Sequence, residues 1–271
     1  MFRYARLLLS ALVLFAAIPA VAYGSAGANK ATLDTSQLDK GTIGIRLAYK
    51  PSVNTKAKIS KGSASYIYTL TPEAKGQTTW LPLQMGNGQY EVAVLENVSG
   101  TKYRVLSSEK IDVAVARTTD VYLNSTQNIG WKDAEEALAK AKELTRNATT
   151  DEEKAKAVYE YIVQNVSYDK ELARKVTADY LPDIDETLAS GQAICYGYAT
   201  LYAAMLRSAG IPTKLAMGTS THVAEYHAWN EVYLNGKWVV VDTTVDAGLG
   251  KNKKNAAFAK KGSDYTAIKY Y

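Results

Sequence analysis

The chain has 271 residues, of which 47% are hydrophobic and 22% are charged, with 18 glycines and 6 prolines. These proportions are those of a globular protein and argue against a disordered chain, a collagen or a coiled coil. The formal net charge of +5 is small and gives no case for nucleic-acid binding, which requires Lys and Arg clustered on one face.

The first 22 residues have the three parts of a secretory signal peptide. Arg3 and Arg6 make a basic start, residues 7–22 form a short uncharged run, and Ala20-Val21-Ala22 ends it with small residues. The run is shorter than a membrane-spanning helix needs, although an uncleaved anchor is the alternative. We therefore expect cleavage after Ala22 and a mature protein without a transmembrane span. It would be secreted to the extracellular space, either free or associated with the cell wall.

Residues 31–123 are dominated by short runs of alternating apolar and polar residues, with turn residues between them. The predicted strands are residues 42–49, 66–70, 90–95, 103–106, 111–115 and 120–123. Several short strands at this spacing predict a small antiparallel β-sandwich of immunoglobulin-like type over residues 23–126. This region contains neither His nor Cys, so we interpret it as a binding or spacer module.

Helical periodicity begins after Trp131 and predicts a first helix over residues 132–147. A second begins at Thr150, where Thr150 and Glu153 fit a capping box, and ends near Tyr168, which we interpret as a core residue. Residues 189–193 read as a small-residue loop.

A third helix begins near Cys195 and stops at Gly210, with Pro212 beyond it. Cys195 is the only cysteine of the chain, so it has no disulfide partner within it. By itself it could be an inert buried thiol, an intermolecular link or a nucleophile. With only two histidines in the chain, a zinc site is poorly supported, and we expect no metal or cofactor.

Three strands are predicted after this helix, over residues 213–217, 226–234 and 237–243. Asn235-Gly236 joins the last two and predicts a two-residue hairpin. The turn sets the register, because Leu234 then opposes Lys237.

Continued along the hairpin, this register places His227 and Asp242 on one face as diagonal neighbours, and His222 on the other face. A thiol nucleophile needs a stabilised anion, a base and a group that orients the base. The start of the third helix favours an anion at Cys195, His227 would be the base, and Asp242 would hold His227. Trp229 and Trp238 are interpreted as packing residues, and the lysines at residues 251–254 and 260–261 as a solvated loop.

Four blocks of sequence resemble the core of the transglutaminase-like superfamily, and the resemblance covers roughly residues 150–246. The blocks are residues 191–199, 206–212, 227–232 and 238–244. The resemblance implies an α+β, papain-like transglutaminase core at residues 127–271 with the catalytic triad Cys195, His227 and Asp242. The Cys195 backbone N–H is the expected oxyanion donor.

The expected function is that of an exported thiol enzyme acting on amide bonds through an acyl-enzyme. Transfer of the acyl group to an amine would cross-link proteins, and transfer to water would give amidase or peptidase action. The alternative is a non-catalytic binding or scaffold protein of the cell envelope. The expected partners are protein or peptide substrates and components of the cell envelope, with no nucleic acid; the oligomeric state stays open.

Overall fold

The computed structural model describes residues 31–71, 76–249 and 256–271. The predicted signal peptide, residues 1–22, and the lysines of residues 251–254 lie outside the described residues. Within the described ranges, no helix is long and apolar enough to cross a membrane.

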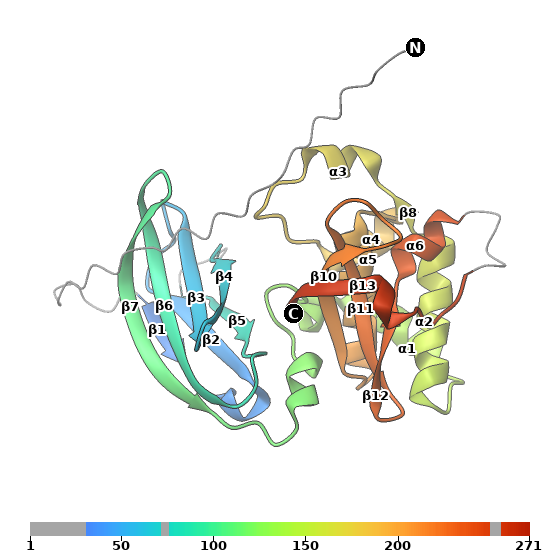
Figure 1. The fold of residues 1–271 in the computed structure, drawn as a ribbon, viewed down its shortest axis with the longest axis horizontal. Helices are drawn as coiled ribbons and strands as arrows, with labels where there is room; N and C mark the ends of the chain where they lie inside the picture. Colours follow the sequence, from blue (N-terminus) through green and yellow to red (C-terminus); the bar gives the residue numbers. More distant parts are fainter. Residues whose placement is uncertain (1–30, 72–75, 250–255) are drawn as a thin grey trace, which may run out of the picture.

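Seven strands in the N-terminal part form two antiparallel sheets, with strand orders β1-β2-β5 and β4-β3-β6-β7 (Figure 1). They are β1 (Ala31–Asp34), β2 (Thr42–Leu47), β3 (Thr55–Lys61), β4 (Ala64–Thr69), β5 (Thr78–Pro82), β6 (Gly88–Ser99) and β7 (Lys102–Val113). Buried residues such as Ile45 of β2 and Ile59 of β3 belong to one hydrophobic core, to which both sheets contribute. The antiparallel β-sandwich expected from the alternating pattern therefore fits the structure.

Three of the predicted strands in this part differ from the structure. Residues 103–106 and 111–115 were expected as two strands, but β7 is continuous, because the polar residues between them still pair with β6. Residues 120–123 lie in a 3-10 helix, Thr118–Leu123, instead of a strand. The neighbours Val121 and Tyr122 are both buried there.

The C-terminal part has six α-helices in its described residues and a four-stranded antiparallel sheet of order β12-β11-β10-β13. The helices are α1 (Glu135–Thr145), α2 (Asp151–Asn165), α3 (Lys170–Lys175), α4 (Ile184–Ser190), α5 (Cys195–Ser208) and α6 (Thr243–Gly248). The sheet strands are β10 (Thr213–Ser220), β11 (His227–Leu234), β12 (Lys237–Val241) and β13 (Tyr265–Tyr270). The predicted helices correspond to α1, α2 and α5, and the mixed helix-and-sheet architecture confirms the α+β class.

Helix α5 is the buried centre of this part and packs against β10 and β11 on one side and α1 and α2 on the other. Every residue from Gly197 to Arg207 is buried. The hydroxyls of Tyr198 and Tyr202 donate hydrogen bonds to backbone carbonyls of the α2 region, at Val166 (2.6 Å) and Ala155 (3.0 Å). Since both hydroxyls find partners, two large tyrosines are buried without an unpaired polar group.

The two parts meet through polar and aromatic contacts, and the C-terminal end of the chain lies between them (Figure 1). Gln84 donates from Nε2 to the Tyr68 hydroxyl at 2.9 Å and to the Tyr270 carbonyl at 3.0 Å. The ring of Tyr68 also meets the edge of the Tyr271 ring, with centroids 6.0 Å apart. The core residues of the sandwich and of the helices form one continuous cluster.

Candidate functional site

Cys195 is the first residue of α5, and it is half-buried. Short strands β8 (Ser167–Tyr168) and β9 (Gln192–Ala193) pair in parallel just before it. A Cβ on Gly197 would lie 2.8 Å from Ala193 Cβ, so the glycine lets the helix start pack closely against β9. Cys195 therefore lies at the end of α5 where the first backbone N–H groups have no partner within the helix.

The hairpin that carries His227 has the predicted register. Leu234 pairs with Lys237, and Asn230 pairs with Val241. Asn235 and Gly236 have φ values of 50° and 80°, as a type I′ turn requires. The side chain of Asn230 donates to the Ala199 carbonyl of α5 at 2.9 Å, which fixes β11 against the helix that carries Cys195.

The imidazole of His227 lies between Asp242 and Cys195. Its Nε2 is 2.8 Å from Asp242 Oδ2, and a second side-chain hydrogen bond joins the ring to Cys195. Because Nε2 faces the carboxylate, Nδ1 is the nitrogen that faces the thiol. Burial lowers the pKa of His227, but the hydrogen bonds to Asp242 and Cys195 outweigh it and raise the pKa from 6.5 to about 9.

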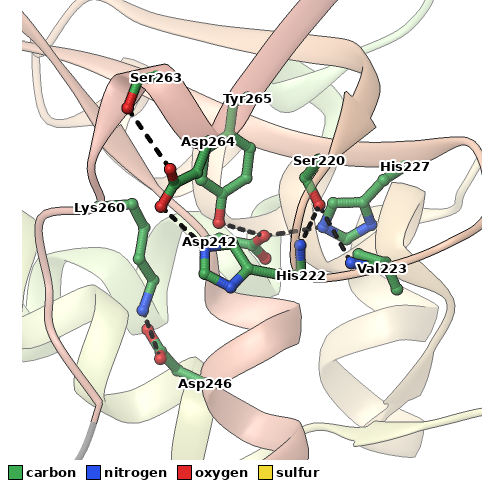
Figure 2. Close-up of polar contacts among 10 residues, drawn as sticks. All are labelled: Ser220, His222, Val223, His227, Asp242, Asp246, Lys260, Ser263, Asp264 and Tyr265. Carbon is green, nitrogen blue, oxygen red and sulfur yellow. Dashed lines mark hydrogen bonds and ion pairs between the residues drawn. The ribbon is translucent and has the colours of Figure 1, made fainter.

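Asp242 is completely buried and uses both oxygens of its carboxylate. Oδ1 accepts from the Val245 backbone N–H at 3.1 Å, which makes Asp242 the N-cap of α6. Oδ2 accepts from His227 and also from the Tyr265 hydroxyl, at 3.0 Å (Figure 2). Asp242 thus both caps α6 and pairs with His227.

His222 lies in the loop between β10 and β11, outside the hairpin whose register was used to place it. Its Nε2 is 3.6 Å from Asp264 Oδ2, and its ring contacts that of Tyr265 with centroids 5.5 Å apart (Figure 2). Among the tryptophans, Trp229 is 1% exposed and packs on Tyr265, in agreement with the packing interpretation.

Tyr168 is the main correction at the site. We expected a core residue, but its side chain is 46% exposed. Pairing of β8 with β9 places Tyr168 opposite Ala193, two residues before Cys195. The pKa of Tyr168 is raised by partial burial and by its electrostatic interaction with Cys195. Its position after the apolar face of α2 made it look like a core residue, and only the long-range β8–β9 pairing brings it to Cys195.

A second buried group close to the triad was also missed. Lys260 was expected in a solvated loop, but only 9% of its side chain is exposed and its Nζ is 2.5 Å from Asp246 Oδ1. The other oxygen of Asp246 accepts from the Tyr159 hydroxyl at 2.7 Å. Lys260 is buried because a buried carboxylate four residues after Asp242 needs a counter-charge.

One family model matches the C-terminal part of the chain. Residues 138–243 match the model of the transglutaminase-like superfamily. A human protein named kyphoscoliosis peptidase is 29% identical over 154 residues, which are 53% of this chain and 22% of that protein. The mouse protein of the same name is 32% identical over 117 residues, 40% of this chain and 18% of its own length. The chain thus spans about a fifth of these relatives.

Two solved structures are similar at a lower level. A candidate cysteine protease from Cytophaga hutchinsonii is 14% identical with a TM-score of 0.43, over 82% of this chain and 69% of that one. The periplasmic domain of TgpA from Pseudomonas aeruginosa is 14% identical with a TM-score of 0.40, over 85% of this chain and 98% of that one. Residues 138–243, which hold Cys195, His227 and Asp242, thus match the transglutaminase-like superfamily as a core domain.

Proposed function

We propose that the protein is a thiol enzyme that acts on amide bonds of protein or peptide substrates, with Cys195 as nucleophile, His227 as base and acid, and Asp242 as the group that orients His227. The observation that carries the proposal is the position of His227, whose imidazole is hydrogen-bonded to Cys195 on one side and to Asp242 at 2.8 Å on the other. This is the arrangement of an activated nucleophile, its base and the group that orients the base.

The raised pKa of His227, about 9, favours an imidazolium at neutral pH. In the proposed mechanism His227 takes the proton of the Cys195 thiol, and the thiolate is the attacking species. The thiolate attacks the carbonyl carbon of the amide, and the carbonyl electrons move to the oxygen to form a tetrahedral oxyanion. His227 then gives its proton to the departing amine, which leaves a thioester on Cys195.

The oxyanion is stabilised by the Cys195 backbone N–H and by the Tyr168 hydroxyl. The start of α5 supports the first donor, because the first N–H groups of a helix have no partner within the helix. Exposure of Tyr168 beside Cys195 supports the second.

The thioester is resolved by a second amine or by water. His227 takes a proton from the incoming nucleophile, the C–S bond breaks, and the thiolate is regenerated. An amine gives a new amide and hence cross-linking, whereas water gives a free acid. The word peptidase in the names of the curated relatives supports the second outcome.

The rest of the chain organisation belongs to the same proposal. A signal peptide at residues 1–22 exports the protein, a β-sandwich domain spans residues 23–126, and the catalytic domain spans residues 127–271. The sequence pattern of the first 22 residues supports export to the cell envelope or beyond.

The test uses a labelled primary amine and a glutamine-containing protein incubated with the mature chain. Incorporation of the amine identifies a transferase, and cleavage or deamidation without incorporation identifies a hydrolase. Cys195→Ala is expected to lower either activity by about 10³-fold or more, while its thermal unfolding stays close to that of the wild type. If neither activity occurs, and iodoacetamide modifies Cys195 no faster than a free thiol, the protein is a non-catalytic binding module.

A further inference from the structure

Tyr265 shares the carboxylate oxygen that holds the candidate base. Its hydroxyl donates to Asp242 Oδ2 at 3.0 Å, and the same oxygen is 2.8 Å from His227 Nε2 (Figure 2). We propose that Tyr265 is a positioning residue of the active site, which fixes the carboxylate of Asp242 and weakens its pull on the His227 proton. This inference rests on the proposed function, because it gives Tyr265 a role through Asp242 and His227.

The hydrogen bonds around Asp242 leave its carboxylate no freedom to rotate. Oδ1 is held by the Val245 backbone N–H at 3.1 Å, and Oδ2 is held by both Tyr265 and His227. The carboxylate is fully buried, so these donors take the place of water. A hydroxyl that donates to Oδ2 spreads the negative charge, and less of it is then available to stabilise an imidazolium.

The ring of Tyr265 is held on both sides. Trp229 packs against it with centroids 5.1 Å apart, and His222 lies 5.5 Å away. Trp229 in turn stacks on His227, at 6.2 Å and an interplanar angle of 24°. Pairing of Tyr265 with Ser220 fixes its backbone to β10. The hydroxyl is therefore preorganised and does not have to find Asp242 during the reaction.

Several other ionisable groups act on the same region. Asp246 and Asp264 join Asp242 as the carboxylates that interact with Tyr265, and Lys260 pairs with Asp246. His222 pairs with Asp264, and Cys195 faces His227 from α5. Of these groups, Asp242 is the carboxylate that is hydrogen-bonded to His227. A change at the Tyr265 hydroxyl therefore reaches the His227 titration chiefly through Asp242.

The chain offers a matched control in Tyr159. Its hydroxyl donates to Asp246 Oδ2 at 2.7 Å, so it is another buried tyrosine that donates to a buried carboxylate. Asp246 lies four residues after Asp242, on α6. Tyr159→Phe removes the same kind of hydrogen bond as Tyr265→Phe, and it leaves the pair of Asp242 and His227 in place.

The test is the rate of alkylation of Cys195 by iodoacetamide as a function of pH, in the full mature chain. The alkaline step of this profile reports loss of the His227 proton. In Tyr265→Phe we expect this step to move up by about half a pH unit, because Asp242 then stabilises the imidazolium more strongly. In Tyr159→Phe it stays where it is in the wild type. Replacement of Tyr265 by 3-fluorotyrosine, whose hydroxyl is a stronger donor of nearly the same size, moves the step down.

The outcomes separate the two proposals. If the wild type shows only the single step of a free thiol, the triad itself is absent and the proposed function fails. If the wild type shows the His227 step, but the pH profiles of Tyr265→Phe and of the fluorotyrosine variant both coincide with the wild-type profile, the role proposed for Tyr265 is wrong. The triad is then unaffected. Equal shifts in Tyr265→Phe and Tyr159→Phe would also overturn it, since they would show a general effect of burial.

Discussion

At the scale of single residues, His227 is controlled by opposing effects. Burial disfavours the charged form of His227, whereas Asp242 and Cys195 favour it. The second effect is the larger, so the pKa of His227 rises to about 9. A pKa of about 9 favours a protonated imidazole at neutral pH, which is the state that the proposed mechanism requires of His227. Two measurable consequences follow, one for activity and one for stability.

Activity is expected to fall as the pH rises through about 9, because His227 then loses the proton that the departing amine needs.

The same proton on His227 contributes to the stability of the fold. The pKa of His227 is higher in the folded chain than its unfolded value of 6.5. The stability that its proton contributes is therefore fully present below pH 6.5 and is lost as the pH rises through about 9. Urea unfolding across this interval checks the sign. The unfolding free energy should decline in the wild type and decline less in His227→Ala; an equal decline would contradict the assignment.

Tyr168 provides a second prediction at this scale. Tyr168→Phe removes one donor to the oxyanion, so kcat should fall by about 10²-fold while KM changes little. Stability should change little, since the side chain is 46% exposed. The matched control is Tyr226→Phe, an exposed tyrosine directly before His227, which should retain the wild-type kcat. Equal rates for the two variants would remove Tyr168 from the reaction.

The sequence was sufficient to place the three triad candidates but not the tyrosines around them. Cys195 follows from a helix start, and His227 and Asp242 follow from a hairpin whose turn type sets the register. These are local signals. Tyr168 and Tyr265 reach the site only through pairings between segments distant in the chain, β8 with β9 and β13 with β10, which no short pattern encodes.

At the scale of elements, the strands of the hairpin and its neighbour β10 were predicted, whereas β8, β9, β13 and the short helices were not. The alternating patterns of β10, β11 and β12 were recognised, and the Asn235-Gly236 register matches the structure. Helix α6 was missed because it has six residues and its N-cap, Asp242, was assigned to the preceding strand. A helix this short depends on its cap and on tertiary packing, not on helical periodicity.

The pairing of β10 with β13 gives a prediction for this scale. The register shifts between Met217 and Gly218, and a Cβ on Gly218 would lie 2.0 Å from the Thr266 carbonyl oxygen. Gly218→Ala should therefore push β13 away, lower the unfolding free energy by about 1–3 kcal/mol and displace Tyr265. Denaturant unfolding measures the loss. In Gly248→Ala the added Cβ meets nothing within 4 Å, and this control should be at least as stable as the wild type. If the unfolding free energy of Gly218→Ala equals that of the wild type, the close approach of Gly218 to the Thr266 carbonyl is absent.

At the scale of the whole molecule, the β-sandwich and the C-terminal part share one hydrophobic core. Arg207, at the end of α5, is buried and donates from Nη1 to the Asn124 carbonyl at 2.8 Å and from Nη2 to the Tyr271 carbonyl at 2.9 Å. One buried guanidinium thus joins the central helix, the segment that follows the sandwich and the C-terminal end of the chain. We infer that the N-terminal part is a structural support of the active site.

This coupling predicts that the two parts unfold together. Tyr68→Ala removes a buried ring that contacts Tyr271, and should lower the unfolding free energy by about 3–5 kcal/mol. Hydrogen exchange should show reduced protection in both β3 and α5. Tyr103 lies on β7 and is only half-buried. Tyr103→Ala is therefore the control, and it should lower the unfolding free energy by less than Tyr68→Ala does. Loss of protection confined to the sandwich would show that the two parts are independent.

The most direct test of the triad is the formation of an acyl-enzyme on Cys195. We predict that p-nitrophenyl acetate releases a burst of about one p-nitrophenolate per protein molecule, and that mass spectrometry finds one acetyl group on the peptide containing Cys195. Both signals should vanish in Cys195→Ala, and the burst should become much slower in His227→Ala. A burst that survives in Cys195→Ala, or an acetyl group found elsewhere in the chain, would contradict the assignment of Cys195 as the nucleophile.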